Sequence, residues 1–177
     1  STLIPNKTDK SKTIIKSQDF DLTTILDFKA KFFDKSYRGK TNLAKAVINV
    51  MKPKKLGFEI LTTCDAPPGT GLASSTAVIT SMVGSLKSFI DISLTSYEIA
   101  ELVYEIERKE LAIKGGLQDQ YACTFGGFYF IEFKNNEVIV NPLRIKREIV
   151  QELESNLLLV DTGVPRSSSK IHSIQSK

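Results

Sequence analysis

The chain of 177 residues has one histidine, two cysteines and no tryptophan. His172, the single histidine, would have to serve any Ser-His-Asp or Cys-His catalytic centre and any zinc site that uses histidine. Its neighbours are mostly serine and lysine, which favours a solvated surface position. Cys64 and Cys123 have neither the number nor the spacing of a disulfide framework or a metal knuckle, and this fits a reducing compartment. The scarce residues therefore argue against a histidine-dependent hydrolase, a zinc protein and a disulfide-rich secreted domain.

Long apolar runs and a strong net charge are also missing. No apolar run is long enough to cross a bilayer, and residues 1–16 are polar and lysine-rich, without the apolar segment of a signal peptide. The 24 Lys and Arg residues against 20 Asp and Glu give a net charge of +4, and no basic run interleaves with aromatic residues as a single-strand binder requires. With 41% hydrophobic and 25% charged residues, the composition is that of a globular domain. We expect a soluble, cytoplasmic protein that binds neither nucleic acid nor membranes.

The apolar periodicity predicts helices and strands that do not alternate regularly, which favours the α+β class. The expected helices cover residues 21–34, 41–51, 79–90, 96–111 and 146–153. Thr95 and Glu98 form a capping box for the fourth of these helices. The expected strands cover residues 13–15, 57–63 and 157–160, with a hairpin of 128–133 and 138–140 turned at 135–136. We expect 157–160 to be buried and 162–177 to be polar, helical or frayed.

A turn-rich segment between the expected strand 57–63 and the helix after it carries the strongest local signal. It reads Pro67-Pro68-Gly69-Thr70-Gly71-Leu72-Ala73-Ser74-Ser75. Glycines let the backbone approach a ligand closely, and small hydroxyl residues at a helix start leave amide donors free to bind phosphate. A serine hydroxyl there can also reach a phosphate-bound magnesium ion. The segment is neither a Walker A loop nor a G-x-G-x-x-G motif, and an ordinary loop with a serine N-cap is the alternative.

Glu107 falls on the apolar face of the helix expected over 96–111. Ile99, Val103, Glu107 and Leu111 follow one another at intervals of four residues, which places all of them on one face. A carboxylate on such a face is costly unless it is paired or binds a metal. The next residues, 108–110, look like solvated surface. The alternative for Glu107 is a position at the edge of the face with its tip in water.

Asp119 follows two glycines after the same helix, in the string Gly115-Gly116-Leu117-Gln118-Asp119-Gln120-Tyr121. A carboxylate on a sharp turn suits a general base or a metal ligand, and a plain turn with an aspartate is the alternative. The loop, Glu107 and Asp119 together supply the parts of a phosphoryl transferase. These parts are amides for phosphate, a hydroxyl and a carboxylate for Mg²⁺, and a carboxylate near the acceptor hydroxyl.

These motifs resemble those of the GHMP kinases, a family that includes galactokinase, homoserine kinase, mevalonate kinase and phosphomevalonate kinase. Residues 68–76 are similar to the P-x-x-G-L-x-S-S-A phosphate loop of the family, with Thr76 in place of the alanine. Glu107 and Asp119 are twelve residues apart, like the magnesium-binding glutamate and catalytic aspartate of galactokinase-like members. Residues 115–128 and 156–169 are most similar to the bacterial D-glycero-D-manno-heptose 7-phosphate kinases within the family. The resemblance covers most of the chain from about position 56 onward.

The resemblance implies the α+β N-terminal lobe of a GHMP kinase, of the ribosomal-protein-S5-like type, and an ATP- and Mg²⁺-dependent kinase of a sugar or sugar phosphate such as a heptose 7-phosphate. By the same resemblance the ATP phosphates would be held by Pro68, Gly69, Thr70, Gly71, Leu72, Ala73, Ser74 and Ser75. Ser75 and Glu107 would bind Mg²⁺, and Asp119 would be the catalytic residue that orients or deprotonates the acceptor hydroxyl. The residues expected to contact the substrate are Gly116, Gln118 and Arg166.

Two further motifs of the family have no counterpart here. Nothing in residues 1–40 matches the family's opening R-x-x-L-x-x-G-G-x-x-D segment, and the chain stops before the glycine-rich motif of the C-terminal lobe. We therefore expect residues 1–155 to be a partial ATP-binding lobe and 156–177 the start of a truncated C-terminal lobe. Such a chain would form a homodimer or join the missing parts of a split kinase. The alternatives are a nucleotide-binding remnant without turnover, and a non-enzymatic interaction module in which Ser74 caps a helix and Glu107 pairs with a lysine.

Overall fold

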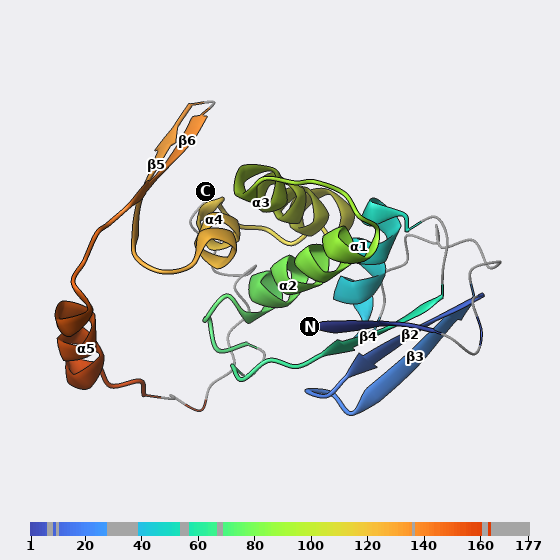
Figure 1. Cartoon of the computed structure of the whole chain (residues 1–177). Helices are drawn as coiled ribbons and strands as arrows, with labels where there is room; N and C mark the ends of the chain where they lie inside the picture. The colour runs from blue at the N-terminus through green and yellow to red at the C-terminus, as the bar shows by residue number, and fades with distance from the viewer. Residues whose placement is uncertain are drawn as a thin grey trace.

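A computed structural model describes residues 1–6, 9, 11–27, 39–53, 57–66, 69–135, 137–160 and 163. Its larger sheet has four strands in the order β1-β4-β2-β3 (Figure 1). The strands are β1 (Thr2–Pro5), β2 (Lys12–Ser17), β3 (Leu22–Asp27) and β4 (Phe58–Thr62). The two central strands, β2 and β4, are parallel, and each outer strand is antiparallel to its neighbour.

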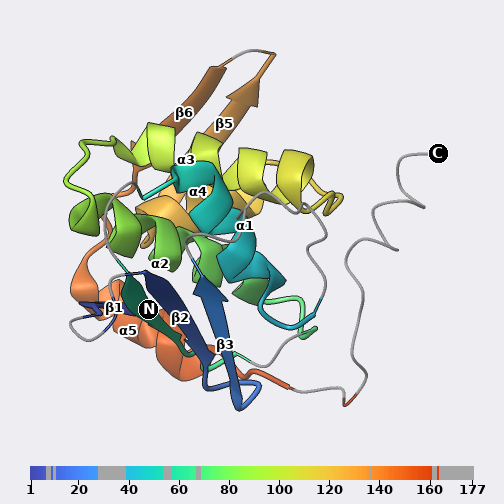
Figure 2. The same ribbon diagram turned by 90° about the vertical axis from the view of Figure 1, so that its right-hand side faces the viewer.

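Helices cover one face of this sheet, as the view turned by 90° shows (Figure 2). They are α1 (Asn42–Met51), α2 (Ser74–Phe89), α3 (Ser96–Glu105), the π-helix η1 (Ile106–Glu110) and α4 (Gln118–Phe125). Alternate residues of β4 are buried because successive side chains of a strand point to opposite faces, and Phe58 and Ile60 face the helices. They pack in one core with Val47 of α1 and the apolar face of α2. The expected α+β organisation is thus a sheet with a helical layer on one side.

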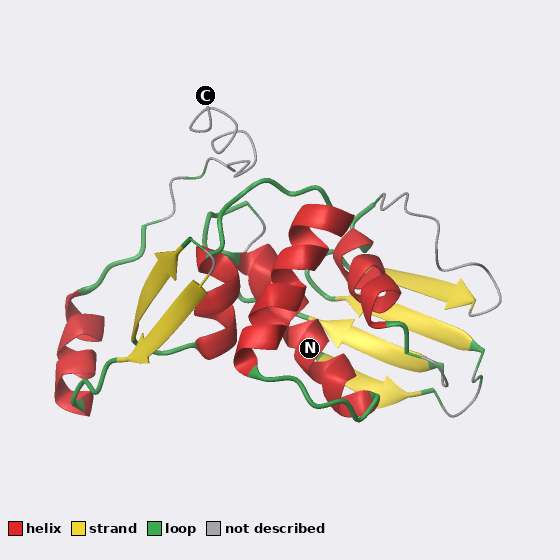
Figure 3. Ribbon diagram, turned by 90° about the horizontal axis from the view of Figure 1, so that it is seen from above, coloured by secondary structure: helices red, strands yellow, loops and turns green. Residues whose placement is uncertain are grey.

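A hairpin and a last helix extend away from this two-layer body (Figures 1 and 3). The hairpin consists of β5 (Tyr129–Lys134) and β6 (Glu137–Pro142), and it is followed by α5 (Arg147–Asn156). The expected hairpin and the expected helix after it are confirmed, but α5 buries none of its residues. The buried strand expected over 157–160 is wrong, because these four residues form no strand and are 67–86% exposed. An apolar run becomes a buried strand only where a pairing edge and a covering layer are in place.

A second error of the sequence prediction lies near the N-terminus. The helix expected over 21–34 is wrong for residues 22–27, which form β3, and residues 28–34 lie outside the described part. Antiparallel pairing with β2 along its whole length outweighs the weak helical spacing of Ile25 and Leu26. Strand β1 was not expected, since its four residues show too little alternation to be recognised. In the described part of the chain, no helix has both the length and the apolar character that a membrane crossing needs.

Candidate functional site

The turn-rich loop leads from β4 into α2 with a backbone that favours glycine. Gly69 and Gly71 have φ of 84° and 78°, and Ala73 at the N-cap of α2 has φ of 53°. Pro67 and Pro68 lie outside the described residues. Within the described loop no side chain caps α2, and Ser74 is the first residue of the helix, so the serine N-cap alternative is wrong. The amide end of a 16-residue helix is therefore open to an anion.

A cavity of about 320 Å³ lies where the two parallel strands end. Ser17 of β2 and Thr62 of β4 are register partners at that end, and both line the cavity. The structure brings most of the expected site residues to its wall, namely Gly69, Gly71, Ala73, Ser74, Ser75, Glu107, Gly116, Gln118 and Asp119. Thr70 and Leu72 belong to the same loop but not to the lining, and Arg166 lies outside the described residues. Segments far apart in sequence thus meet at one place.

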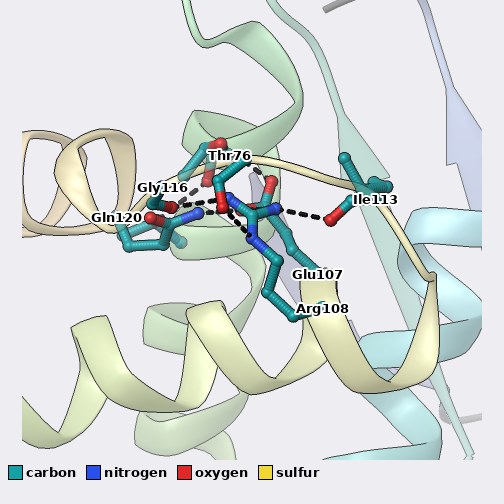
Figure 4. A network of polar contacts seen from close by, with 8 residues as sticks. Thr76, Glu107, Arg108, Ile113, Gly116 and Gln120 are labelled. Atoms are coloured by element: carbon teal, nitrogen blue, oxygen red, sulfur yellow. Dashed lines mark hydrogen bonds and ion pairs between the residues drawn. The ribbon is translucent and has the colours of Figure 1, made fainter. Parts of the chain in front are cut away.

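Glu107 is the buried charge of this cavity. It lies in η1 and is 2% exposed, so the alternative with its tip in water is wrong. Thr76 Oγ1 donates to Oε1 of Glu107 at 2.8 Å, and Gln120 Nε2 donates to Oε2 (Figure 4). Arg108 Nη1 lies 3.7 Å from Oε2, so the cation beside Glu107 is an arginine rather than the lysine of the interaction-module alternative. Two hydrogen bonds and a nearby positive charge offset the cost of burying the carboxylate.

Arg108 was expected on the solvated surface, and this is wrong. Its side chain is 16% exposed and turns back over the segment between η1 and α4. Its Nη1, Nη2 and Nε donate to the carbonyl oxygens of Ile113, Gly116 and Gly115 at 2.8, 2.6 and 3.1 Å. A planar guanidinium with five donors can hold three carbonyls of one short segment at once. Arg108 thereby fixes the path of the chain that leads to Asp119.

Asp119 lies in the first turn of α4 rather than on an open turn. Helix α4 was missed because its eight residues are too short for a clear apolar period. Asp119 is exposed and lines the cavity, whereas Gln120 beside it is buried. Asp119 therefore lies on the wall of the cavity, whereas the buried amide of Gln120 bonds to Glu107.

Cys123 lies one turn after Asp119 on α4, and its pKa is affected by burial and by two nearby carboxylates. Burial, and to a smaller extent the charges of Asp119 and Glu107, together raise the pKa of the Cys123 thiol to about 11. Both cysteines are free, as their number and spacing predicted.

The cavity offers oxygen ligands that suit a magnesium ion held partly by phosphate. Among the described residues no group of three or more His, Cys, Asp or Glu gathers at one point, so a metal here would depend on few protein ligands. Mg²⁺ commonly keeps several waters and takes one or two carboxylates together with substrate phosphates. Glu107 and Ser75 line the same cavity, and each carboxylate oxygen of Glu107, with one donor assigned to it, retains acceptor capacity. This donor set fits Mg²⁺.

Other charged residues of the cavity were missed by sequence reasoning. Asp19, Lys40 and Lys114 line it together with the expected set. No local motif marks them, because they come from the turn after β2, the approach to α1 and the segment that Arg108 holds. Only the meeting of these segments in space identifies them.

The fold and the site together define the class of protein. Residues 42–127 match the family model described as "GHMP kinases N terminal domain". This part of the chain is a GHMP kinase N-terminal domain, and the family resemblance carried by the loop, Glu107 and Asp119 is confirmed.

The individual relatives are kinases of heptose phosphates and other sugars. The chain is 41% identical over 171 residues to a D-glycero-alpha-D-manno-heptose 7-phosphate kinase of Campylobacter jejuni, covering 90% of this chain and 50% of the relative. A solved D-glycero-D-manno-heptose 1-phosphate kinase of Bacteroides thetaiotaomicron aligns with a TM-score of 0.72 at 34% identity, over 87% of this chain and 50% of that one. A putative sugar kinase of Campylobacter jejuni aligns with a TM-score of 0.73 at 40% identity, over 86% and 49%. The chain therefore spans about half the length of the relatives it matches, and the expected partial GHMP kinase fold is confirmed.

Proposed function

We propose that this chain carries the ATP- and Mg²⁺-binding half of a sugar kinase that transfers the γ-phosphoryl group of ATP to a hydroxyl of a heptose phosphate. The observation that carries the proposal is the single cavity that unites the uncapped amide end of α2, Ser75, Glu107 and Asp119. Amide donors, a hydroxyl and two carboxylates are the groups that phosphoryl transfer needs at one place. The heptose phosphates are chosen because two of the relatives named above are heptose phosphate kinases.

Each part of the cavity has a role in this proposal. The backbone amides of residues 69–75 hold the ATP phosphates, and the positive end of the α2 dipole faces them. Ser75 and Glu107 hold Mg²⁺, which when bound neutralises the charge that develops on the transferred group. Asp119 accepts the proton of the acceptor hydroxyl as the oxygen forms its bond to the γ-phosphorus and ADP leaves. Gly116 and Gln118 face the acceptor, and Arg166 is proposed as a further contact to it.

Further proposals concern the context of the cavity. Residues 1–155 form the ATP-binding lobe and 156–177 begin a second lobe. The protein works in the cytoplasm, where ATP and sugar phosphates are available. We also propose that the chain acts as a homodimer or together with the remaining part of the kinase fold that its relatives possess.

The first test is Asp119→Asn. We measure phosphoryl transfer to heptose 7-phosphate, heptose 1-phosphate and galactose, and in parallel the rise in melting temperature with Mg²⁺-ATP. Asp119→Asn abolishes transfer and keeps the rise, because Asp119 acts on the acceptor and not on the nucleotide. Equal transfer rates in variant and parent would contradict the role of Asp119.

The same melting measurements separate the rival functions. A ligand at a hundred times its dissociation constant stabilises the native state by about 2.7 kcal/mol, or roughly 5–10 °C for a domain of this size. A rise without transfer to any sugar, even with the remaining part of the kinase fold supplied, identifies a nucleotide-binding remnant. No rise with Mg²⁺-ATP identifies an interaction module and overturns the proposed function.

A further inference from the structure

We propose that Thr76 and Gln120 are positioning residues that orient the carboxylate of Glu107 for the metal and set its distance from Ser75 and Asp119. The proposal rests on the proposed function, in which Glu107 binds Mg²⁺. It adds two residues to which that function assigns no role. We call Thr76, Glu107 and Gln120 the carboxylate brace.

The brace joins three elements through one buried group. Thr76 of α2 and Gln120 of α4 each donate to a different oxygen of Glu107 in η1, which removes the freedom of the carboxylate to rotate (Figure 4). All three side chains are at most 3% exposed. A donor on each oxygen, at a buried carboxylate, holds the carboxylate in one plane. Such outer-shell bonds orient metal ligands in many proteins.

The brace also affects the residues next to its two donors in the sequence. Thr76 directly follows Ser75, and Gln120 directly follows Asp119, so each donor is the chain neighbour of a residue that faces the cavity. Fixing Thr76 and Gln120 on one carboxylate therefore fixes the spacing among Ser75, Glu107 and Asp119. A displacement of about 1 Å among such groups is enough to cost a large factor in rate.

The hydroxyl of Thr76 bonds differently from those of Thr80 and Ser88 on the same helix. Thr80 and Ser88 donate their hydroxyls to backbone carbonyls of α2 itself. Thr76 instead donates across to Glu107. Where the family loop given above has alanine, this chain has a hydroxyl group directed at the proposed metal ligand.

Gln120 supports the same conclusion from the other side. Its Nε2 donates to Glu107, while its buried Oε1 has no hydrogen-bond partner within the described structure. A buried acceptor without a partner costs free energy, so packing alone would favour an apolar side chain at this position. We infer that Gln120 is present at this position because its amide group donates to Glu107.

The test compares metal affinity with metal-free stability. We measure the dissociation constant of Mn²⁺, used as a paramagnetic substitute for Mg²⁺, by electron paramagnetic resonance in the presence of ADP. Urea unfolding without metal gives the structural cost of each variant. Thr76→Val keeps the shape but removes the hydroxyl, and Gln120→Met removes the amide. We expect each to weaken Mn²⁺ binding about tenfold, the lower end of typical outer-shell effects.

Two further variants make the comparison specific. Thr76→Ser restores the donor, and we expect its Mn²⁺ affinity to stay within about twofold of the parent, below the effect of a lost outer-shell bond. Thr80→Val removes a hydroxyl of the same type one turn along α2, which donates to the carbonyl of Thr76. We expect Thr80→Val to leave Mn²⁺ affinity unchanged, whatever its effect on stability.

The outcomes separate this proposal from the function on which it rests. If Thr76→Val and Gln120→Met lower the unfolding midpoint but bind Mn²⁺ like the parent, the brace is merely structural and the proposal is wrong. If Glu107→Gln also binds Mn²⁺ like the parent, the metal role of Glu107 is wrong, which is a failure of the proposed function. If Thr76→Val does not fold, the Mn²⁺ affinity of Gln120→Met relative to the parent tests the proposal instead. A parent chain that binds no Mn²⁺ with ADP overturns both.

Discussion

The guanidinium of Arg108 lies so close to Gly115 that a Cβ added to Gly115 would be 2.7 Å from Nη2 and 3.2 Å from Cζ. Nε of the same guanidinium donates to the carbonyl oxygen of Gly115 at 3.1 Å. The segment between η1 and α4 can close on Arg108 because residue 115 has no side chain. The same segment leads into α4, and Asp119 lies in the first turn of α4.

Gly115→Ala should lower the free energy of unfolding by about 1–3 kcal/mol, the usual cost of overpacking. The added methyl group must displace a guanidinium that three hydrogen bonds hold in place. Gly116→Ala is the matched control, since a Cβ at Gly116 meets nothing within 4 Å, and it should change stability by less than about 0.5 kcal/mol. Urea unfolding measures both. Equal effects of the two substitutions would show that Arg108 yields to the methyl group at no cost.

Arg108→Lys should be far from neutral although it keeps the charge beside Glu107. An ammonium on a flexible stem cannot reproduce a planar fork that reaches three carbonyl oxygens, so we expect a loss of about 2–3 kcal/mol. Lys109→Arg, on the exposed side of the same π-helix, should have little effect. Unfolding experiments on both variants test this. A stable Arg108→Lys variant would mean that charge alone maintains the segment.

Cys123 should resist alkylation in the native protein. With a pKa of about 11, only about one thiol in a thousand is ionised at pH 8, and the thiolate is the reactive form. In a Cys64→Ser background, iodoacetamide should label Cys123 slowly in buffer and much faster in urea. Asp119→Asn should raise the native rate modestly, because it removes a negative charge that raises the pKa while burial, the larger cause, remains. Native labelling at the rate seen in urea would contradict the burial of this thiol.

The capping box of α3 should make stability depend on pH at the acid end. Thr95 donates its backbone N–H and its hydroxyl to the carboxylate of Glu98, at 2.7 and 2.8 Å, and this lowers the pKa of Glu98 from 4.5. A lowered pKa in the folded state means that the stabilisation is complete above pH 4.5 and is lost as the pH falls through the folded value. The stability difference between the parent and Glu98→Ala should therefore shrink below pH 4.5. Urea titrations from pH 7 to pH 3 measure it, and a constant difference would exclude this contribution.

The sequence predicted best those elements whose stability is local. The capping box at Thr95 and Glu98 is confirmed, and so are helices α1, α2 and α3, because caps and apolar periods act within a few residues. The spacing of four residues also placed Glu107 on the buried face, and the structure has it there. The last turn of that helix widens into η1, a change that no periodicity indicated.

The errors fall where a residue depends on a distant partner. Residues 22–27 are a strand because β2 pairs with them, and 157–160 are not one because no strand or layer meets them within the described structure. The sequence predicts Arg108 on the surface, because nothing local indicates that the segment 113–116 packs against its side chain. Thr76 and Gln120 gave no signal in sequence, since 44 positions separate them and only Glu107 brings them together.

By itself, therefore, the sequence determined the chemistry available to this protein: a glycine-rich loop before a helix, a carboxylate on an apolar face and an aspartate twelve residues later. These features are properties of single segments, and short-range sterics and periodicity are enough to define them. The tertiary structure decided which groups surround that carboxylate and which face the cavity with it. Hydrogen bonds between helices that are remote in sequence require their relative placement, and the packing of α2, η1 and α4 supplies it.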